Sequence, residues 1–169
     1  MIWIALLAAS AAGEDVLLRA ARETVEAAKY CFLITVDAAG QPQARLMEPF
    51  APDRDLVVWM GTTPGSRKVT QIRANPRATL ACHNPKGPDY VTLVGRARVI
   101  DDLAERRRRW RPGWEAFFPG GPDGQNYILV ELTPSRVEVI SHTHKIANAP
   151  EARGPAMVER KGDRWVILP

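Results

Sequence analysis

The sequence predicts a mainly β fold, a closed antiparallel barrel of about six strands with two or three flanking helices. Short segments rich in strand-forming residues follow one another with hairpin turns between them, and few helical segments interrupt them. The length of 169 residues and the hydrophobic content of 46% suit one domain with a single core. No internal repeat and no low-complexity segment divides the chain.

Residues 2–12 form an uncharged apolar run that is too short to span a bilayer, so no stable membrane insertion is expected. Small residues follow the run, and Glu14 and Asp15 come next. This order favours a signal peptide over residues 1–13, although a basic segment before the run is missing. A protein exported in this way is periplasmic or secreted. The alternative is the start of a helix that continues to Lys29, in a cytoplasmic protein.

The elements that follow alternate between strands and turns. Apolar residues at helical spacing predict a helix over residues 14–29. Strands are expected over residues 30–36, 42–50, 56–60, 77–82, 90–100 and 127–140. Short helices are expected over residues 66–75 and 101–110. Gly40 suits the positive φ of a hairpin turn, and Gly95 suits a bulge in the long strand.

The turn over residues 62–68 is the most informative segment. Ser66 is the expected N-cap of a short helix, and Arg67 and Lys68 occupy its first turn, where cations oppose the helix macrodipole. An anion on the free N–H groups, surrounded by hydroxyls and both cations, would explain this arrangement. The sequence therefore predicts a phosphate-binding turn, against the alternative of a capped surface helix with solvated cations.

Charge and cysteine content exclude several classes of protein. The net charge of +4 suits anionic ligands but is too small to indicate nucleic acid binding. Cys31 and Cys82 form no CxxC motif; they could form one disulfide bridge, but two buried thiols are the preferred interpretation.

His142 and His144 alternate along an expected strand, so both rings would face one side. Their spacing is not that of metal ligands, and no metal site is predicted.

In their order along the chain, these elements resemble the pyridoxamine 5'-phosphate oxidase-like FMN-binding split β-barrel family, most closely its general-stress-protein branch. The similarity covers residues 14–140 and rests on several motifs in sequence. They are an arginine-led strand, a Gly-Thr strand end, a Ser-Arg-Lys turn, an Asn-Pro-Arg continuation and a long strand. The resemblance implies that FMN is bound by Arg45, Leu46, Met47, Glu48, Gly61, Thr62, Ser66, Arg67, Lys68 and Tyr90.

The same resemblance implies the arrangement of the whole protein. We expect an α+β fold, a six-stranded antiparallel split β-barrel with flanking helices, over residues 14–141. Residues 142–169 would be a C-terminal extension that could form a β-hairpin. A homodimer is expected, with the flavin in the groove between the protomers. The cations, Thr62 and Ser66 would hold the phosphate end, while Met47, Glu48 and Tyr90 would lie nearer the ring.

The function implied is that of an FMN-binding oxidoreductase-like protein whose substrate is not specified. The biosynthetic oxidase ends in a segment of the Trp-to-Arg-Leu-His type that this C-terminus lacks, so pyridoxine-phosphate oxidation is not expected. Three alternatives stay open: a non-catalytic flavin carrier or stress protein, a barrel that uses a deazaflavin, and a haem-binding barrel with His142 or His144 as axial ligand. No residue stands out as a general acid or base.

Two segments between the long strand and the last barrel strand allow two interpretations each. Residues 106–109 are four arginines preceded by acidic residues, and a solvated helix face is preferred over an anion or nucleic acid patch. The aromatic residues Trp110, Trp114, Phe117 and Phe118 form either a wall near the flavin or a lid packed on the barrel.

Overall fold

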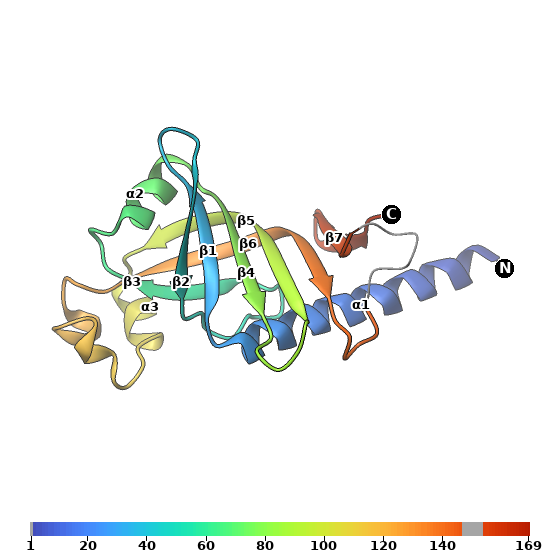
Figure 1. Cartoon of the computed structure of the whole chain (residues 1–169), viewed down its shortest axis with the longest axis horizontal. Coiled ribbons are helices and arrows are strands. Elements are labelled where there is room, and N and C mark those ends of the chain that lie inside the picture. Colours follow the sequence, from blue (N-terminus) through green and yellow to red (C-terminus); the bar gives the residue numbers. More distant parts are fainter. Residues whose placement is uncertain (1, 147–153) are drawn as a thin grey trace.

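One antiparallel sheet forms the centre of the molecule (Figure 1). The computed structural model describes residues 2–146 and 154–169, and for residues 2–12 it describes the backbone only. The elements in chain order are α1 (Ile2–Ala28), β1 (Cys31–Val36), β2 (Pro42–Met47), β3 (Val58–Thr62), α2 (Arg67–Ala74), β4 (Arg77–His83), β5 (Tyr90–Ile100), α3 (Leu103–Arg108), η1 (Trp114–Ala116), η2 (Gly121–Asp123), β6 (Ile128–Ile140), β7 (Ala156–Lys161) and β8 (Arg164–Ile167).

The sheet follows the order β2-β1-β4-β5-β6-β7-β8, and β3 pairs with the first half of β6. Within the described residues there are thus eight strands, of which β1 to β6 correspond to the six expected ones. The mainly β, α+β prediction is confirmed. The remaining two strands form a hairpin that turns at Gly162 and extends the sheet through β6, because β7 pairs with the second half of that long strand.

The barrel wall is split between β2 and β3. In the described part of the chain these two strands share only the isolated bridge between Pro49 and Met60, while their other pairings are to β1 and β6. Pro49 cannot donate a ladder hydrogen bond, which explains why β2 ends at Met47 and not at residue 50 as expected. Two strand edges therefore flank an opening in the wall.

The start of β3 also differs from the expectation. The turn after residue 52 is held by the Asp53 carboxylate, which accepts from the N–H groups of Asp55 and Val57 at 2.9 Å. This turn places Leu56 at a φ of 61°, in the left-handed region, while its side chain is fully buried. The strand therefore begins at Val58, two residues later than expected.

The core lies between the sheet and α1. The buried residues of this helix, which include Leu17, Ala21 and Val25, form one cluster with the inward-facing residues of the strands. Gly95 coincides with a register shift between β5 and β6, where an added Cβ would lie 2.1 Å from the Thr133 carbonyl oxygen. The expected bulge is present because only glycine fits there.

The preference for two buried thiols was wrong, since Cys31 and Cys82 form a disulfide. The two residues are direct cross-strand partners in the β1–β4 pair, with a Cα–Cα distance of 4.5 Å, and both are buried. A cross-strand position with this separation allows a bridge. Pairing of the two strands, which the sequence alone did not fix, is what brings the sulfurs together.

The expected strand position of His142 and His144 was also wrong. Strand β6 ends at Ile140, and the chain then turns between the bridge residues Ser141 and Ile146. The buried Asp89 carboxylate holds this turn, because it accepts from the Ser141 hydroxyl at 2.9 Å and from the His142 N–H at 2.8 Å. These hydrogen bonds lower the pKa of Asp89, although burial opposes them and is the largest single effect.

Candidate functional site

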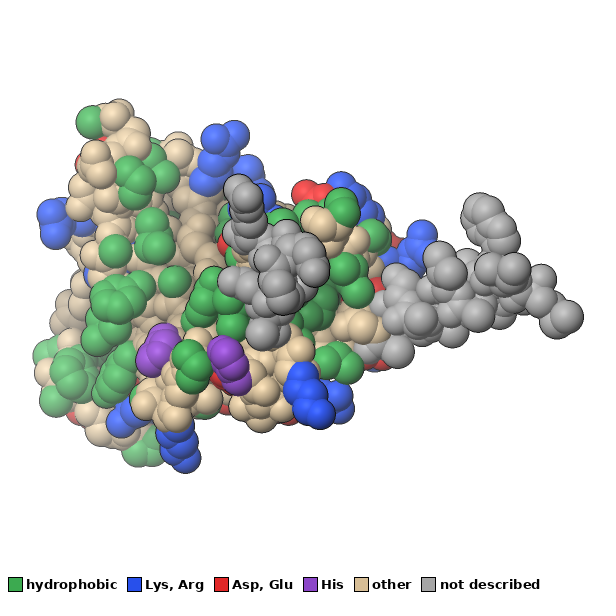
Figure 2. All heavy atoms as spheres, turned by 45° about the vertical axis from the view of Figure 1, so that its right-hand side comes forward, with side chains coloured by type: hydrophobic (Ala, Val, Ile, Leu, Met, Phe, Trp, Pro, Cys, Tyr) green, Lys and Arg blue, Asp and Glu red, His purple; other side chains and the backbone are tan. Residues whose placement is uncertain are grey.

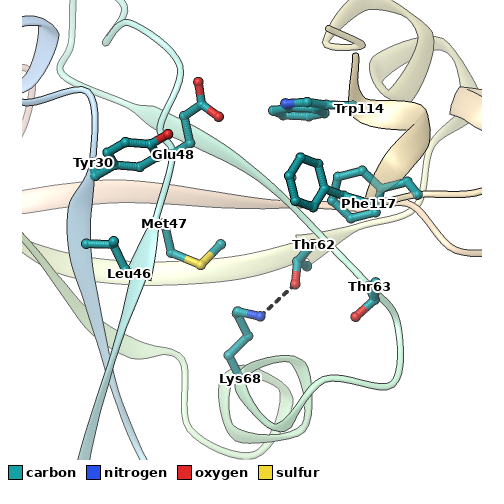
Figure 3. A pocket seen from close by; sticks show the side chains of 11 residues that line it. Tyr30, Leu46, Met47, Glu48, Thr62, Thr63, Lys68, Trp114 and Phe117 are labelled. Carbon is teal, nitrogen blue, oxygen red and sulfur yellow. Dashed lines mark hydrogen bonds between the residues drawn. The ribbon is translucent and has the colours of Figure 1, made fainter. Parts of the chain in front are cut away.

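A cavity of about 460 Å³ lies at the split in the barrel wall (Figure 3). Its lining comes from four parts of the chain: the end of β2 with Tyr30, the end of β3, the first turn of α2, and the segment around η1. The lining residues are Tyr30, Leu46, Met47, Glu48, Gly61, Thr62, Thr63, Lys68, Trp114, Phe117 and Phe118. Six of the ten expected site residues are among them, and the volume lies within the usual range for small-molecule sites.

One end of the cavity carries hydroxyl groups and a half-buried cation. The Lys68 ammonium donates to the Thr62 hydroxyl at 2.9 Å, and this hydroxyl lies 3.2 Å from that of Ser66. Ser66 has the extended backbone of an N-cap but makes no side-chain capping bond, which differs from the expectation. Its hydroxyl faces Thr62 instead, and so the expected polar groups do converge at the start of α2.

Arg45 lies just behind this end. Its guanidinium donates to the Leu33 carbonyl oxygen at 3.0 Å, to the Thr35 hydroxyl at 2.6 Å and to the Gln71 side-chain oxygen at 2.9 Å. All three acceptors are uncharged. Arg45 is therefore well positioned by β1 and α2, but its positive charge is not neutralised by these contacts.

Burial and neighbouring cations lower the pKa of two of the cations at this end. Burial, and then the charge of Arg45, lowers the pKa of Lys68 below its usual value. Burial, and then the charge of Arg67, lowers the pKa of Arg45. In the described residues, none of these three cations forms an ion pair with a carboxylate. Arg45 and Lys68 are half-buried and Arg67 is exposed. Such a group of uncompensated cations suits an anionic ligand, because an anion would supply the missing counter-charge.

The opposite wall is formed by the segment that contains α3, η1 and η2, which we call the lid (residues 103–126). Trp114 and Phe118 form a second buried cluster with Tyr127 and Leu129, and Trp110 packs against it. The Trp114 and Tyr127 ring centroids are 5.7 Å apart in an edge-to-face arrangement. Trp114, Phe117 and Phe118 also line the cavity, so the aromatic wall and the packed lid are the same residues.

Tyr127 anchors the lid cluster through its hydroxyl, which donates to the Arg109 carbonyl oxygen at 2.8 Å. Burial raises the pKa of Tyr127 to about 12, so the hydroxyl stays protonated and remains a donor. Its position beneath the lid, outside the set of residues that line the cavity, gives it a structural role.

The solvated-face interpretation of the four arginines was wrong for two of them. Arg106 is buried and donates to the carbonyl oxygens of Pro122 and Gly124. The guanidinium of Arg109 stacks on the Trp59 ring at 3.6 Å from its centroid. Arg107 and Arg108 are exposed, as expected. The acceptors of Arg106 lie sixteen and eighteen residues further along the chain, where helical patterning carries no signal.

Arg111 is a site residue that the motifs did not identify. It forms an ion pair with Glu48 at 2.7 Å, donates to the Pro49 carbonyl oxygen at 2.9 Å, and lies over the Phe50 ring at 4.1 Å from its centroid. It thus ties the lid to the chain just after β2. Tyr30 and Thr63, which also line the cavity, were missed, although both adjoin motif residues.

Four expected site residues lie outside the lining of the cavity: Arg45, Ser66, Arg67 and Tyr90. The first three belong to the cation end described above. Tyr90 opens β5 and pairs with His83 and Ile140, so one protomer does not bring it to the cavity. None of the three histidines lines the cavity either. No group of metal-ligating side chains was found within the described residues.

The site therefore has two chemically different ends. An uncompensated cation group with hydroxyls lies at one end, and an apolar wall with aromatic side chains lies at the other. Such a cavity fits a ligand that joins an anionic group to a planar, largely apolar body. The class of protein is therefore a split antiparallel barrel with a cation-rich turn, residues 62–68, at the split.

Comparison with known proteins identifies the family. Residues 17–141 match the family model described as pyridoxamine 5'-phosphate oxidase, and the chain belongs to this family. A pyridoxine/pyridoxamine 5'-phosphate oxidase of Anaeromyxobacter dehalogenans is 33% identical over 99 residues, which are 58% of this chain and 50% of the relative. The chain thus spans about half the length of the curated relative that it matches.

Solved structures share the fold at lower identity. General Stress Protein 26 of Bacillus anthracis is 22% identical, with a TM-score of 0.65 over 73% of this chain and 93% of that one. A pyridoxamine 5'-phosphate oxidase-related, FMN binding protein of Nostoc punctiforme is 21% identical, with a TM-score of 0.61 over 90% and 93%. A heme binding protein of Mycobacterium smegmatis is 19% identical, with a TM-score of 0.59 over 73% and 53%. These likenesses concern the fold.

Proposed function

We propose that this protein binds FMN at the split of the barrel and acts as an oxidoreductase-like flavoprotein. The observation that carries the proposal is the group of uncompensated cations, Arg45, Arg67 and Lys68, at one end of an otherwise largely apolar cavity. A phosphate monoester accepts from several donors at once, which suits two guanidinium groups, an ammonium and the hydroxyls of Thr62 and Ser66.

The lining residues at the ends of β2 and β3 would serve the ring. Leu46, Met47 and Glu48 would lie along one side of the flavin, and Gly61 leaves room beside Trp114. Bound FMN would supply the redox chemistry, while the chain would supply position, electrostatics and exclusion of water. Activity as the biosynthetic pyridoxine-phosphate oxidase is not part of this proposal.

Titration of FMN-free protein with FMN tests the proposal. The double variant Arg67→Ala, Lys68→Ala should lose at least about a hundredfold in affinity, since each charged hydrogen-bonded contact contributes about 1.5–3 kcal/mol. Lys86→Ala, which removes an exposed cation from the loop before β5, should leave the affinity unchanged. If the double variant binds FMN as tightly as the wild-type protein, the phosphate assignment is wrong.

The absorption spectrum of the purified protein separates the alternative cofactors. Flavin bands support the proposal, a deazaflavin spectrum would replace FMN, and a Soret band would indicate haem. The structure offers no particular support for haem, because His142 and His144 lie in the turn after β6 and do not line the cavity. Reduction by NAD(P)H followed by reoxidation distinguishes an enzyme from a non-catalytic flavin carrier.

We also propose a homodimer. Outward-facing side chains on β1 and β2 leave an apolar surface, in which Phe32 and Leu46 are direct cross-strand partners and both are exposed. Figure 2 shows hydrophobic side chains gathered over the left half of the molecule, which holds the sheet. A surface of this kind on a soluble protein favours association with a second copy.

Export is the last part of the proposal. The Cys31–Cys82 disulfide supports an oxidising compartment, since such bridges persist outside the cytoplasm. Helix α1 runs without a break from Ile2 to Ala28, so its backbone is equally compatible with retention of residues 2–12. Within the described residues no helix combines the length and apolar character needed to cross a membrane. Mass spectrometry of the native protein, with a count of free thiols, tests the proposal; an intact Met1 and two free thiols would contradict it.

A further inference from the structure

The outer half of the cavity carries two exposed aromatic side chains, Tyr30 and Phe117, that the FMN proposal does not explain. Phe117 is 71% exposed although it lines the cavity, while Tyr30 and Leu46 are 46% and 55% exposed. Figure 3 places Trp114 and Phe117 on the lid side and Tyr30 with Leu46 on the β2 side. Large apolar side chains that surround a common hollow favour a ligand with an apolar body.

Among the described residues of one protomer, this half of the cavity offers no unpaired charge. Glu48 and Lys68 are the only charged residues among those that line the cavity in the described chain. Lys68 lies at the opposite end, beside Thr62. Glu48 is paired with Arg111 at 2.7 Å, so each neutralises the other. A second phosphate or carboxylate would find no unpaired cation here, and its transfer from water would be costly.

We propose that the outer half of the cavity takes an uncharged planar aromatic compound, with Phe117 as the residue that determines this specificity. The proposal rests on the proposed function, in which the Lys68 end is occupied by the phosphate of FMN. An aromatic ligand gains edge or face contacts with Phe117, Tyr30 and Trp114, which add to the burial of its apolar surface. A charged ligand of the same shape gains the same contacts but loses its hydration.

Two probes that differ only in charge test the inference on FMN-loaded protein. Naphthalene-2-carboxamide is uncharged and planar, and naphthalene-2-carboxylate has nearly the same shape. Equilibrium dialysis, with the shift of the visible flavin band as a second readout, should give at least about tenfold tighter binding of the amide. Pyridoxine 5'-phosphate should bind more weakly than the amide as well.

Variants separate the role of Phe117 from general damage. Phe117→Ala should weaken binding of the amide by about tenfold and leave FMN affinity unchanged, while Phe117→Tyr should retain binding of the amide. Leu103→Ala is the matched control, because Leu103 is an exposed apolar residue, at 42%, on α3 and outside the lining of the cavity.

The outcomes distinguish this inference from the function on which it rests. Three results would overturn the inference alone. They are FMN-loaded protein that does not bind the amide, equal binding of the amide and the carboxylate, and a Phe117→Ala variant that binds the amide like wild type. Protein that fails to take up FMN overturns the proposed function and the inference together.

Discussion

Lys68 lies in surroundings that disfavour its positive charge. Burial is the main cause of its lowered pKa, and the nearby charge of Arg45 adds to it. In the described residues it has no carboxylate partner, only the Thr62 hydroxyl. A cation that destabilises the ligand-free fold is explained if binding of an anion offsets the cost. Perturbed pKa values cluster at functional sites.

The pH dependence of folding tests this view of Lys68. Because its pKa is lower in the folded state than in the unfolded state, the unfolded chain binds more protons between the two values, and stability rises with pH there. The penalty is full below the folded pKa and vanishes above the usual value of 10.5. In urea unfolding of FMN-free protein, the stability of wild type relative to Lys68→Met should therefore rise as the pH is raised toward 10.5. If the stability difference between wild type and Lys68→Met stays constant or falls over this pH range, Lys68 does not destabilise the ligand-free fold.

Gly61 sets the width of the cavity beside Trp114. An added Cβ would lie 2.7 Å from a Trp114 ring carbon and 3.0 Å from a Tyr127 ring carbon. Gly61→Ala should lower the free energy of unfolding by about 1–3 kcal/mol through overpacking, and it should weaken FMN binding by displacing Trp114. Thermal unfolding and FMN titration measure the two effects.

Gly65 provides the control for this variant, because nothing lies within 4 Å of an added Cβ there. Gly65→Ala should change stability by less than about 1 kcal/mol. If both alanine variants behave like wild type, Gly61 does not control the position of the Trp114 wall.

At the scale of elements, the lid is held by arginines and not by its own short helices. Arg106 binds two carbonyl oxygens of the η2 turn and pairs with Asp101 at 2.8 Å. Arg111 binds Glu48 and the Pro49 carbonyl oxygen beyond β2. Helix α3 has only six residues, too few to be stable without tertiary contacts. The position of the aromatic wall therefore depends on these long side chains.

Removal of the Arg106 guanidinium should loosen the lid. Arg106→Leu leaves the carbonyl oxygens of Pro122 and Gly124 without their donor, at a cost of about 1–3 kcal/mol per buried group. Hydrogen exchange over residues 111–126 should increase, with little change in β4 and β5. Arg108→Ala, on the same helix but with a largely exposed side chain, is the control. Equal exchange in both variants would show that Arg106 does not hold the lid.

The sequence predicted local features of these elements better than their tertiary partners. Gly40 and Gly95 were identified correctly because a hairpin turn and a bulge impose requirements on a single residue. The turn over residues 62–68 stood out because its cations are unfavourable at a helix start, and its binding of phosphate stays a prediction. The roles of Arg106 and Arg111 were not predictable, since their acceptors belong to segments brought together only by folding. The Cys31–Cys82 bridge was missed for the same reason: it depends on the pairing of β1 with β4.

For the molecule as a whole, the cavity of one chain is open to the outside. It opens at the split between β2 and β3, and exposed apolar residues of β1 and β2 continue outward from it. Tyr90, expected near the flavin ring, lies at the start of β5 and outside the cavity of its own protomer. If the proposed dimer places the flavin in a groove between protomers, Tyr90 would reach the cofactor of the partner and not its own.

Disruption of the apolar sheet surface should separate the protomers and weaken FMN binding together. Phe32 is 53% exposed and adjoins Leu46 across the β1–β2 pair, so Phe32→Glu would bury an unpaired carboxylate in the proposed interface. Size-exclusion chromatography with light scattering should give the mass of two chains for wild type and for Val166→Glu, an exposed apolar position on β8. Phe32→Glu should elute as one chain and bind FMN at least about tenfold more weakly. If the wild-type protein is monomeric and still holds flavin, the proposed dimer is wrong. A groove between two protomers would then not be needed for flavin binding.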